Sequence, residues 1–362
     1  MWRTRLLLSS VMIAARLASA VPPIFNVGVD DPSNSLCDPP GEADLRSLCE
    51  LSTASSGRWI PTTITPIPPG YGGAPDADYQ TDCDGKWAAG HDVSVTGPRP
   101  LWHWCPDSCH LPAFHPQLFC YAAHQRNVTG VLTVGDSLNR LFSTTLATAL
   151  SAERLQHQND EIEHGGEAYL ACGGALRLKF VRNDILRVDD SDTSECHDIC
   201  QQFLPYLEAD QGYNAVVVNS GAHYLEDSAY IAHMMAAADV ISAGMREAHP
   251  DGSSFMMFRN TVPGSPYCDM FKFSPPLEPF VAESRIADRW ATNDWPYHWE
   301  MFKRHNDLAE PIFAGKGFTV MDAYTPTVQR FDSHQGGFDC LHYCIPGPID
   351  HWIRLLQLAL LA

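Results

Sequence analysis

Beyond residue 130, short apolar runs alternate with longer stretches of helical periodicity. The apolar runs cover residues 131–134, 176–181, 215–218, 255–258 and 318–321. Strands of a parallel sheet are this uniformly apolar because helices cover both faces. Helical spacing follows in the residues after 137, in 230–248 and in 297–308. This alternation predicts an α/β fold of three layers, α/β/α, around a mostly parallel five-stranded sheet.

The N-terminal third of the chain has a different pattern. Residues 21–79 are rich in proline, glycine and serine, and tryptophans and cysteines crowd residues 102–114. Such a composition indicates an irregular segment held in place by disulfides. We therefore predict a signal peptide over 1–20, an irregular N-terminal extension over 21–125 that packs on the core, and the α/β domain over 126–362.

The first twenty residues have the three parts of a secretion signal. Arg3 and Arg5 precede an apolar stretch over 6–15, and small residues follow at 18–20. This order predicts cleavage after Ala20. A retained signal anchor is the alternative that the sequence leaves open. No later segment has the apolar length to span a bilayer.

Charge and cysteine content narrow the class of protein further. The chain has 43 acidic and 24 basic residues, a net charge of −19, which disfavours binding to nucleic acid. Its twelve cysteines behind a secretion signal predict disulfides formed in an oxidising compartment. Three C-x-x-x-C pairs leave a zinc site as an alternative, although they lack the usual two-residue spacing. A single N-glycosylation sequon, at Asn127, agrees with a secretory route.

Polar residues follow all five predicted strands. Carboxyl ends of parallel strands meet at one edge of a sheet, where ligands bind. The residues of interest after the strands are Ser137, Arg182, Asn183, Asn219, Gly221, His223, Arg259, Asp339 and His342. The sequence therefore predicts a catalytic site at this edge, with no metal or tightly bound cofactor.

Three of these residues form a known chemical combination. Ser137 follows the first strand in the string Gly-Asp-Ser, and Asp339 and His342 lie three residues apart. A serine hydroxyl becomes a good nucleophile when a histidine takes its proton and a carboxylate orients that histidine. The helix expected after the serine would favour negative charge on an oxyanion. Each string alone is weak, since Gly-Asp-Ser also begins many ordinary helices.

Together the motifs resemble the SGNH hydrolase superfamily, and within it the PC-esterase or trichome birefringence-like family of glycan O-acetyltransferases. The strings that carry the resemblance are Gly57-Arg58-Trp59, Trp104-Cys105-Pro106, Cys109-His110-Leu111-Pro112, Val134-Gly135-Asp136-Ser137-Leu138, Asn219-Ser220-Gly221, Arg330-Phe331-Asp332-Ser333-His334 and the run from Asp339 to Trp352. The last string is the most specific. The resemblance extends from about Cys49 to the C-terminus, and it implies an SGNH-like catalytic domain.

The resemblance also implies roles for the site residues. Ser137 would be the nucleophile, His342 the general base and Asp339 its orienting partner. The Ser137 backbone N–H and the Asn219 side chain would stabilise the oxyanion. For the second backbone donor we predict an N–H near Asn183, where the chain departs from the superfamily pattern.

Four further residues are candidates for substrate binding: Arg182, Gly221, His223 and Arg259. His223 has an alternative role in capping a helix, and Arg259 has one in pairing with an acidic side chain. Cysteines on both sides of His342 are expected to bridge to other loops and so hold the base rigidly.

The predicted function is transfer of an acetyl group onto a carbohydrate hydroxyl through an acyl-serine, in the Golgi lumen or outside the cell. The partners would be an acyl donor and a glycan acceptor. An esterase with the same three residues is the first alternative, because water can replace the sugar. A secreted glycan-binding module without catalysis is the second.

Overall fold

The computed structural model describes residues 37, 47–65, 83–155, 167–188, 199–288, 297–337 and 339–362. The predicted signal peptide lies outside these residues. Among the described residues, we find no helix with both the length and the apolar character needed to cross a membrane.

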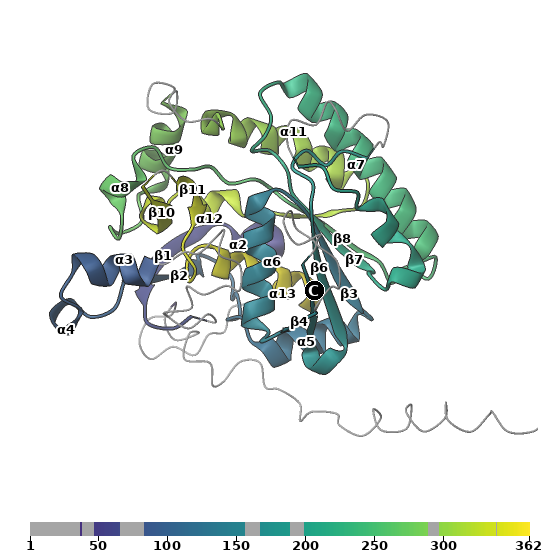
Figure 1. Cartoon of the computed structure of the whole chain (residues 1–362), viewed down its shortest axis with the longest axis horizontal. Helices are drawn as coiled ribbons and strands as arrows, with labels where there is room; N and C mark the ends of the chain where they lie inside the picture. Colours follow the sequence, from purple (N-terminus) through teal and green to yellow (C-terminus); the bar gives the residue numbers. More distant parts are fainter. Residues whose placement is uncertain are drawn as a thin grey trace, which may run out of the picture.

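The core of the molecule is a seven-stranded sheet in the order β4-β5-β6-β3-β7-β8-β9 (Figure 1). The strands are β3 (Gly130–Gly135), β4 (Glu153–Arg154), β5 (Ala168–Ala171), β6 (Leu176–Arg182), β7 (Ala215–Val218), β8 (Phe255–Arg259) and β9 (Thr319–Met321). The five predicted strands are β6, β3, β7, β8 and β9, and neighbours among them pair in parallel. An α/β fold with a mostly parallel sheet is thus confirmed.

The predicted count of five strands was wrong, because β4 and β5 extend one edge in antiparallel pairing. β4 is two charged residues long, so it has no apolar pattern to detect. β5 is joined to β6 by a tight turn through Gly173 and Gly174, both with positive φ. A short hairpin arm of this kind depends on its neighbour rather than on its own pattern.

Helices cover both faces of the sheet. On one face lie α5 (Pro116–Gln125), α6 (Ser137–Ala149) and the C-terminal α13 (Ile349–Leu361), and their apolar side chains form one buried cluster with the sheet. The other face packs against α7 (Asp227–Ala248) and α11 (Phe302–Ala314), whose side chains join a second cluster. The predicted helices after residue 137 and over 230–248 are confirmed. The stretch predicted at 297–308 is a short 3₁₀ turn, η7 (Trp299–Met301), followed by α11.

Smaller elements surround this core. The short helices are α2 (Leu51–Ala54), α3 (Cys83–Gly90), α4 (Val93–Thr96), α8 (Cys268–Phe271), α9 (Pro279–Ala287) and α12 (Tyr324–Thr327). The further 3₁₀ turns are η3 (Cys172–Gly174), η5 (Leu204–Leu207), η6 (Ala209–Gln211) and η8 (Phe331–Ser333). Outside the main sheet, β10 (His334–Gly336) and β11 (Asp339–Tyr343) form an antiparallel hairpin, which we call the catalytic hairpin because it holds two of the candidate site residues.

The described part of 21–125 is more regular than predicted. β1 (Gly57–Thr62) pairs antiparallel with β2 (Leu101–Pro106), and α5 follows. Trp59 and Trp104 face each other across this pair, with ring centroids 5.2 Å apart. Aromatic pairs across neighbouring strands stabilise a small sheet, which the proline-rich composition had concealed. The domain boundaries at residues 20 and 125 remain a prediction.

Disulfides are present, as the cysteine content predicts. Among the described residues the bridges are Cys37–Cys105, Cys49–Cys109, Cys83–Cys344, Cys120–Cys172 and Cys268–Cys340, and the third and fourth of these join the N-terminal part to the rest of the chain. Cys200 is also disulfide-bonded. Asn127 lies in an exposed turn after α5, with a positive φ. This position is accessible to glycosylation, which itself stays a prediction.

Candidate active site

Ser137 stands at the turn from the central strand into a helix. β3 ends at Gly135, and α6 begins at Ser137. A Cβ on Gly135 would lie 2.4 Å from the carbonyl oxygen of Asn219, so only glycine allows the ends of β3 and β7 to approach this closely. β3 also lies between the two halves of the sheet: after β3 the chain forms β4, β5 and β6 on one side of it, and then crosses to β7 on the other side. Ligand sites of α/β sheets lie at such switch points.

Asp136 caps the helix that carries Ser137. Its Oδ1 atom accepts hydrogen bonds from the backbone N–H groups of Leu138 (2.9 Å) and Asn139 (3.4 Å). These bonds leave the N–H of Ser137 itself without an acceptor among the described residues. Burial raises the pKa of Asp136, while the charges of His223 and Arg259 lower it. The Asp136 cap thus fixes the start of the helix that carries Ser137.

The side chains of Ser137, His342 and Asp339 form one hydrogen-bonded series. The distance from Ser137 Oγ to His342 Nε2 is 2.7 Å, and that from His342 Nδ1 to Asp339 Oδ2 is 2.8 Å. An ionised carboxylate only accepts, so Nδ1–H donates to Asp339 and Nε2 is left to accept the serine proton. The side chains of His342 and Asp339 are 14% and 35% exposed, so the site opens to solvent.

Asp339 is held in its ionised form. Burial alone would raise the pKa of Asp339, but the His342 side chain and two backbone N–H groups outweigh burial and lower it to about 2. The Oδ1 atom accepts from the N–H of Leu341 at 3.2 Å and from that of His342 at 2.9 Å. Both carboxylate oxygens therefore bind the same short turn, which orients the imidazole.

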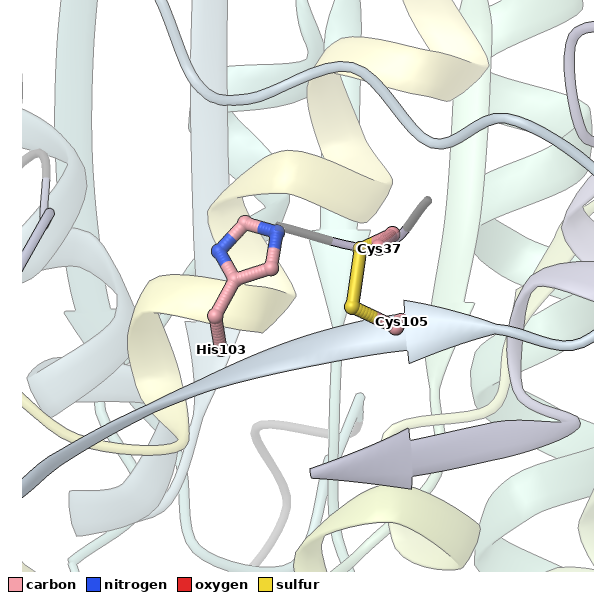
Figure 2. A group of neighbouring side chains, drawn as sticks. All are labelled: Cys37, His103 and Cys105. Atoms are coloured by element: carbon pink, nitrogen blue, oxygen red, sulfur yellow. A yellow bond between two sulfur atoms is a disulfide. The ribbon is translucent and has the colours of Figure 1, made fainter. Parts of the chain in front are cut away.

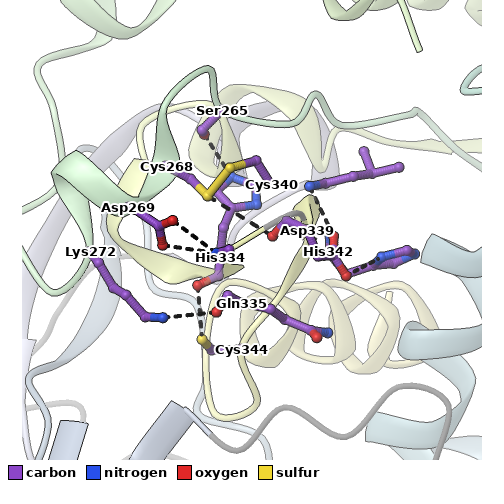
Figure 3. The surroundings of a disulfide bond; sticks show 12 residues. Ser265, Cys268, Asp269, Lys272, His334, Gln335, Asp339, Cys340, His342 and Cys344 are labelled. Atoms are coloured by element: carbon purple, nitrogen blue, oxygen red, sulfur yellow. Dashed lines mark hydrogen bonds and ion pairs between the residues drawn. A yellow bond between two sulfur atoms is a disulfide. The ribbon is translucent and has the colours of Figure 1, made fainter. Parts of the chain in front are cut away.

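Two disulfides hold the catalytic hairpin, as predicted from the cysteines beside His342. Cys340 is bonded to Cys268 in α8, and Cys344 is bonded to Cys83 in α3 (Figure 3 shows both Cys340 and Cys344 beside the turn). The sequence did not reveal which loops would supply the partners. The imidazole thus comes from a hairpin that is covalently fixed on both sides of its position.

The proposed oxyanion donors are partly supported by the geometry. Asn219 follows β7 directly and is fully buried beside Gly135. Its Nδ2 atom donates to the carbonyl oxygen of Arg259 at 3.0 Å, and a carboxamide carries a second N–H. The Asn183 N–H instead donates to the carbonyl oxygen of Gly135 at 3.0 Å. Because this N–H continues the pairing of β6 with β3, the prediction of Asn183 as an oxyanion donor was wrong.

Arg182 and His223 lie at the same edge of the sheet, around Asp184. Arg182 Nε donates to Asp184 Oδ1 at 2.9 Å, and His223 Nε2 lies 3.8 Å from Asp184 Oδ2. The His223 ring also packs edge-on against Tyr297, with centroids 5.6 Å apart. Gly221 leaves no room for a side chain, because a Cβ there would lie 2.5 Å from Thr261. Arg182 and His223 keep part of their side chains exposed, at 18% and 12%.

Arg259 lies beneath the site instead of facing a ligand. It is 0% exposed, its Nε donates to Asn139 Oδ1 at 3.3 Å, and its guanidinium lies 4.5 Å from the Trp352 ring centroid. Burial lowers the pKa of Arg259 to about 10. The prediction that Arg259 contacts substrate was therefore wrong: the sequence shows that it ends a strand, but not that its side chain turns towards α6 and α13.

One other group of potential ligands deserves comparison with a metal site. Donor atoms of Cys37, His103 and Cys105 lie within 4.8 Å of one another. Figure 2 shows that the two sulfur atoms are bonded to each other, so they supply no thiolate. Burial and the charge of Arg354 lower the pKa of His103 to about 2. The group is a disulfide beside a buried neutral histidine.

The fold and the site together define a class: an α/β protein with a hydrogen-bonded serine, histidine and aspartate at the carboxyl edge of its parallel sheet. No protein-family model matches the chain. Xyloglucan O-acetyltransferase 4 of Populus trichocarpa is 23% identical over 298 residues, 70% of each chain. Protein trichome birefringence-like 24 of Arabidopsis thaliana is 29% identical over 101 residues, 26% of this chain and 20% of that relative. The resemblance to the trichome birefringence-like family is thereby confirmed.

Proposed function

We propose that this protein is an O-acetyltransferase with an SGNH-like fold that moves an acetyl group onto a carbohydrate hydroxyl through an acyl-serine. The observation that carries the proposal is the series Ser137–His342–Asp339, with distances of 2.7 and 2.8 Å. The similarity to a protein named as a xyloglucan O-acetyltransferase supports a glycan acceptor. The disulfides and the relatives are consistent with the secretory pathway, and we propose the Golgi lumen or the cell exterior as the site of action.

In the first half-reaction, His342 removes the Ser137 proton as Oγ attacks the carbonyl carbon of the donor ester. The resulting oxyanion is stabilised by the Ser137 N–H at the start of α6 and by the remaining N–H of Asn219. His342 then returns the proton to the leaving alkoxide, and the acyl-serine forms. Asp339 stays ionised throughout and stabilises the imidazolium, as its low pKa requires.

In the second half-reaction, His342 deprotonates a sugar hydroxyl, which attacks the acyl-serine and releases Ser137. The acceptor enters where His342 and Asp339 keep solvent contact. His223 and Tyr297 line the adjoining part of the edge and present an aromatic surface, which suits a sugar ring. Arg182, held by Asp184, adds a polar group there.

The test is covalent loading of the purified protein with an acetyl ester, followed by intact mass. Ser137→Ala should abolish the acetyl adduct and lower turnover by at least about 10³-fold. Ser143→Ala is the matched control, since Ser143 is a buried serine of the same helix outside the series, and it should load normally. An undiminished adduct in Ser137→Ala would refute the nucleophile.

The same assay separates transfer from hydrolysis. With a xyloglucan oligosaccharide present, a transferase should give acetylated sugar at the expense of free acetate. Equal release of acetate with and without the sugar would identify an esterase. A panel of other plant cell-wall oligosaccharides then identifies the acceptor by the largest kcat/KM.

A further inference from the structure

A short segment after β8 braces the catalytic hairpin. This bracing segment, residues 263–268, has four links to the hairpin. Tyr343 Oη donates to the Pro263 carbonyl oxygen (2.6 Å), and Cys268 is disulfide-bonded to Cys340. The Ser265 N–H donates to the Cys340 carbonyl oxygen (2.9 Å), and Ser265 Oγ lies 2.6 Å from His334 Nε2. Packing is close, because a Cβ on Gly264 would lie 2.5 Å from the Cys340 carbonyl oxygen and 2.2 Å from Trp299. The hairpin therefore has a continuous support on this side.

Ser265 is the one residue of the bracing segment that hydrogen-bonds to both strands of the hairpin. Figure 3 shows the bond of its side chain to His334. Its N–H binds β11 at Cys340, between Asp339 and His342, and its hydroxyl binds β10 at His334. His334 is the pairing partner of Tyr343, next to His342. The contact between Ser265 and His334 is thus connected, through the pairing of β10 with β11, to the strand that carries the base and its carboxylate.

The pair has the composition of a nucleophile and its base, but it lies where no substrate reaches. Ser265 and His334 are 3% and 1% exposed. Among the groups that face His334, Asp339, Asp332 and the backbone of His342 favour its protonated form, whereas the charge of the His342 ring disfavours it. Burial is the largest effect and lowers the pKa of His334 to about 4. The imidazole therefore stays neutral at the pH of the secretory pathway and places no second positive charge beside His342.

We propose that Ser265 and His334 are positioning residues that set the place of His342 and Asp339 relative to Ser137. The inference depends on the proposed function, in which His342 acts on the Ser137 hydroxyl. A base that is displaced by about 1 Å can cost a reaction about 10²-fold, so a single support of the turn has a measurable effect on turnover. The contribution is separate from that of the disulfide, because the hydroxyl of Ser265 binds the opposite strand.

The experiment compares Ser265→Ala with wild type by the burst and steady-state hydrolysis of a chromogenic acetyl ester. The variant keeps the backbone contact with Cys340 and loses only the bond to His334. Rates are divided by the concentration of sites that acylate, so that unfolded protein does not count. The kcat per site should fall about 10- to 100-fold while KM changes less than about twofold.

Two substitutions of His334 complete the test. His334→Gln places an amide near the position of Nε2, and because an amide can donate or accept, it can keep a hydrogen bond with the Ser265 hydroxyl and should restore most of the kcat per site. His334→Leu can form no such bond, and should resemble Ser265→Ala. If His334→Gln loses as much kcat per site as His334→Leu, the hydrogen bond does not position the turn and the inference is overturned.

Ser242→Ala is the matched control. Ser242 is a fully buried serine in α7, and its hydroxyl donates to the Lys316 carbonyl oxygen at 2.9 Å. It should lose stability like Ser265→Ala but retain wild-type kcat per site. An unchanged kcat per site in Ser265→Ala would refute positioning, even when Ser137→Ala is inactive. Acyl loading in Ser137→Ala would instead refute the proposed function itself.

Discussion

A buried carboxyl at the start of α13 makes the stability of this protein depend on pH in a direction opposite to that of most carboxylates. Asp350 Oδ2 accepts a hydrogen bond from Thr65 Oγ1 at 2.6 Å, and its Oδ1 atom is inaccessible to solvent. Burial raises the pKa of Asp350 from 3.8 to about 6, although the Thr65 hydroxyl, the Gly347 backbone and the charge of Arg99 oppose that rise. The folded state therefore prefers the protonated carboxyl.

The sign and size of the effect follow from this pKa. Below pH 3.8 the group is protonated in both the folded and the unfolded chain, so it does not penalise folding. As pH rises through 6 the proton is lost from the folded chain too, and stability falls by about 3 kcal/mol, at 1.36 kcal/mol per pKa unit. Asp350→Asn carries no charge at any pH and still accepts the Thr65 bond.

The free energy of unfolding of Asp350→Asn minus that of wild type should therefore rise by about 2.5 kcal/mol between pH 4 and pH 7.5, since a small part of the effect is already present at pH 4. Urea unfolding followed by tryptophan fluorescence at several pH values measures this difference. Effects of the substitution that do not involve the charge cancel, because they are the same at each pH. The control Asp210→Asn removes an exposed acidic side chain, and its difference from wild type should show no such rise. A flat or falling difference for Asp350→Asn would refute the reasoning.

Two further predictions concern the supports of the site. Replacing Cys268 and Cys340 together by alanine opens a loop of 72 residues, which should lower the free energy of unfolding by about 4 kcal/mol and reduce kcat at nearly unchanged KM. Urea unfolding measures the stability and ester kinetics measure kcat and KM. A loss of stability below about 1 kcal/mol would contradict the loop-entropy argument. Gly135→Ala places a Cβ 2.4 Å from the Asn219 carbonyl oxygen and should lower kcat by about 10²-fold. Gly90→Ala is the control and should retain full activity, since a Cβ there meets nothing within 4 Å. Equal activities of Gly135→Ala and Gly90→Ala would show that the site does not depend on the close approach of β3 to β7.

The central strands could be predicted from the sequence because a strand that is buried on both faces consists of consecutive apolar residues. β7 over Ala215–Val218 begins and ends where the apolar run does. The antiparallel strands were missed for other reasons: β4 is only two charged residues long, and β5, although its four residues are apolar, is defined as a strand by its pairing with β4 and β6. The pairing of β1 with β2 was missed because it joins residues about forty to fifty positions apart in a proline-rich region.

The candidate site residues, too, were predictable only where the local sequence determines their placement. Asp339 and His342 were predictable as a pair because they are only three residues apart, and Ser137 because a strand, a glycine and a helix are contiguous around it. Asn183 and Arg259 were misplaced because a position after a strand fixes the edge of the sheet but not the direction of a side chain or the partner of an N–H. Ser265 has no sequence signal at all, since its role arises from contacts with residues about seventy positions further along the chain.

The two halves of the site are held in place by different means. Ser137 is fixed by the sheet itself, since Gly135 and Asn219 are continuous with paired strands and Asp136 caps the helix. His342 lies 205 residues later on a hairpin that belongs to no larger sheet, so strand pairing does not bring it within 2.7 Å of Ser137. That precision must come from links to other segments, among them the bracing segment with its disulfide to Cys340 and the second disulfide at Cys344. Substitutions near the base should therefore affect turnover through its supports, whereas substitutions near the nucleophile should affect folding of the sheet as well.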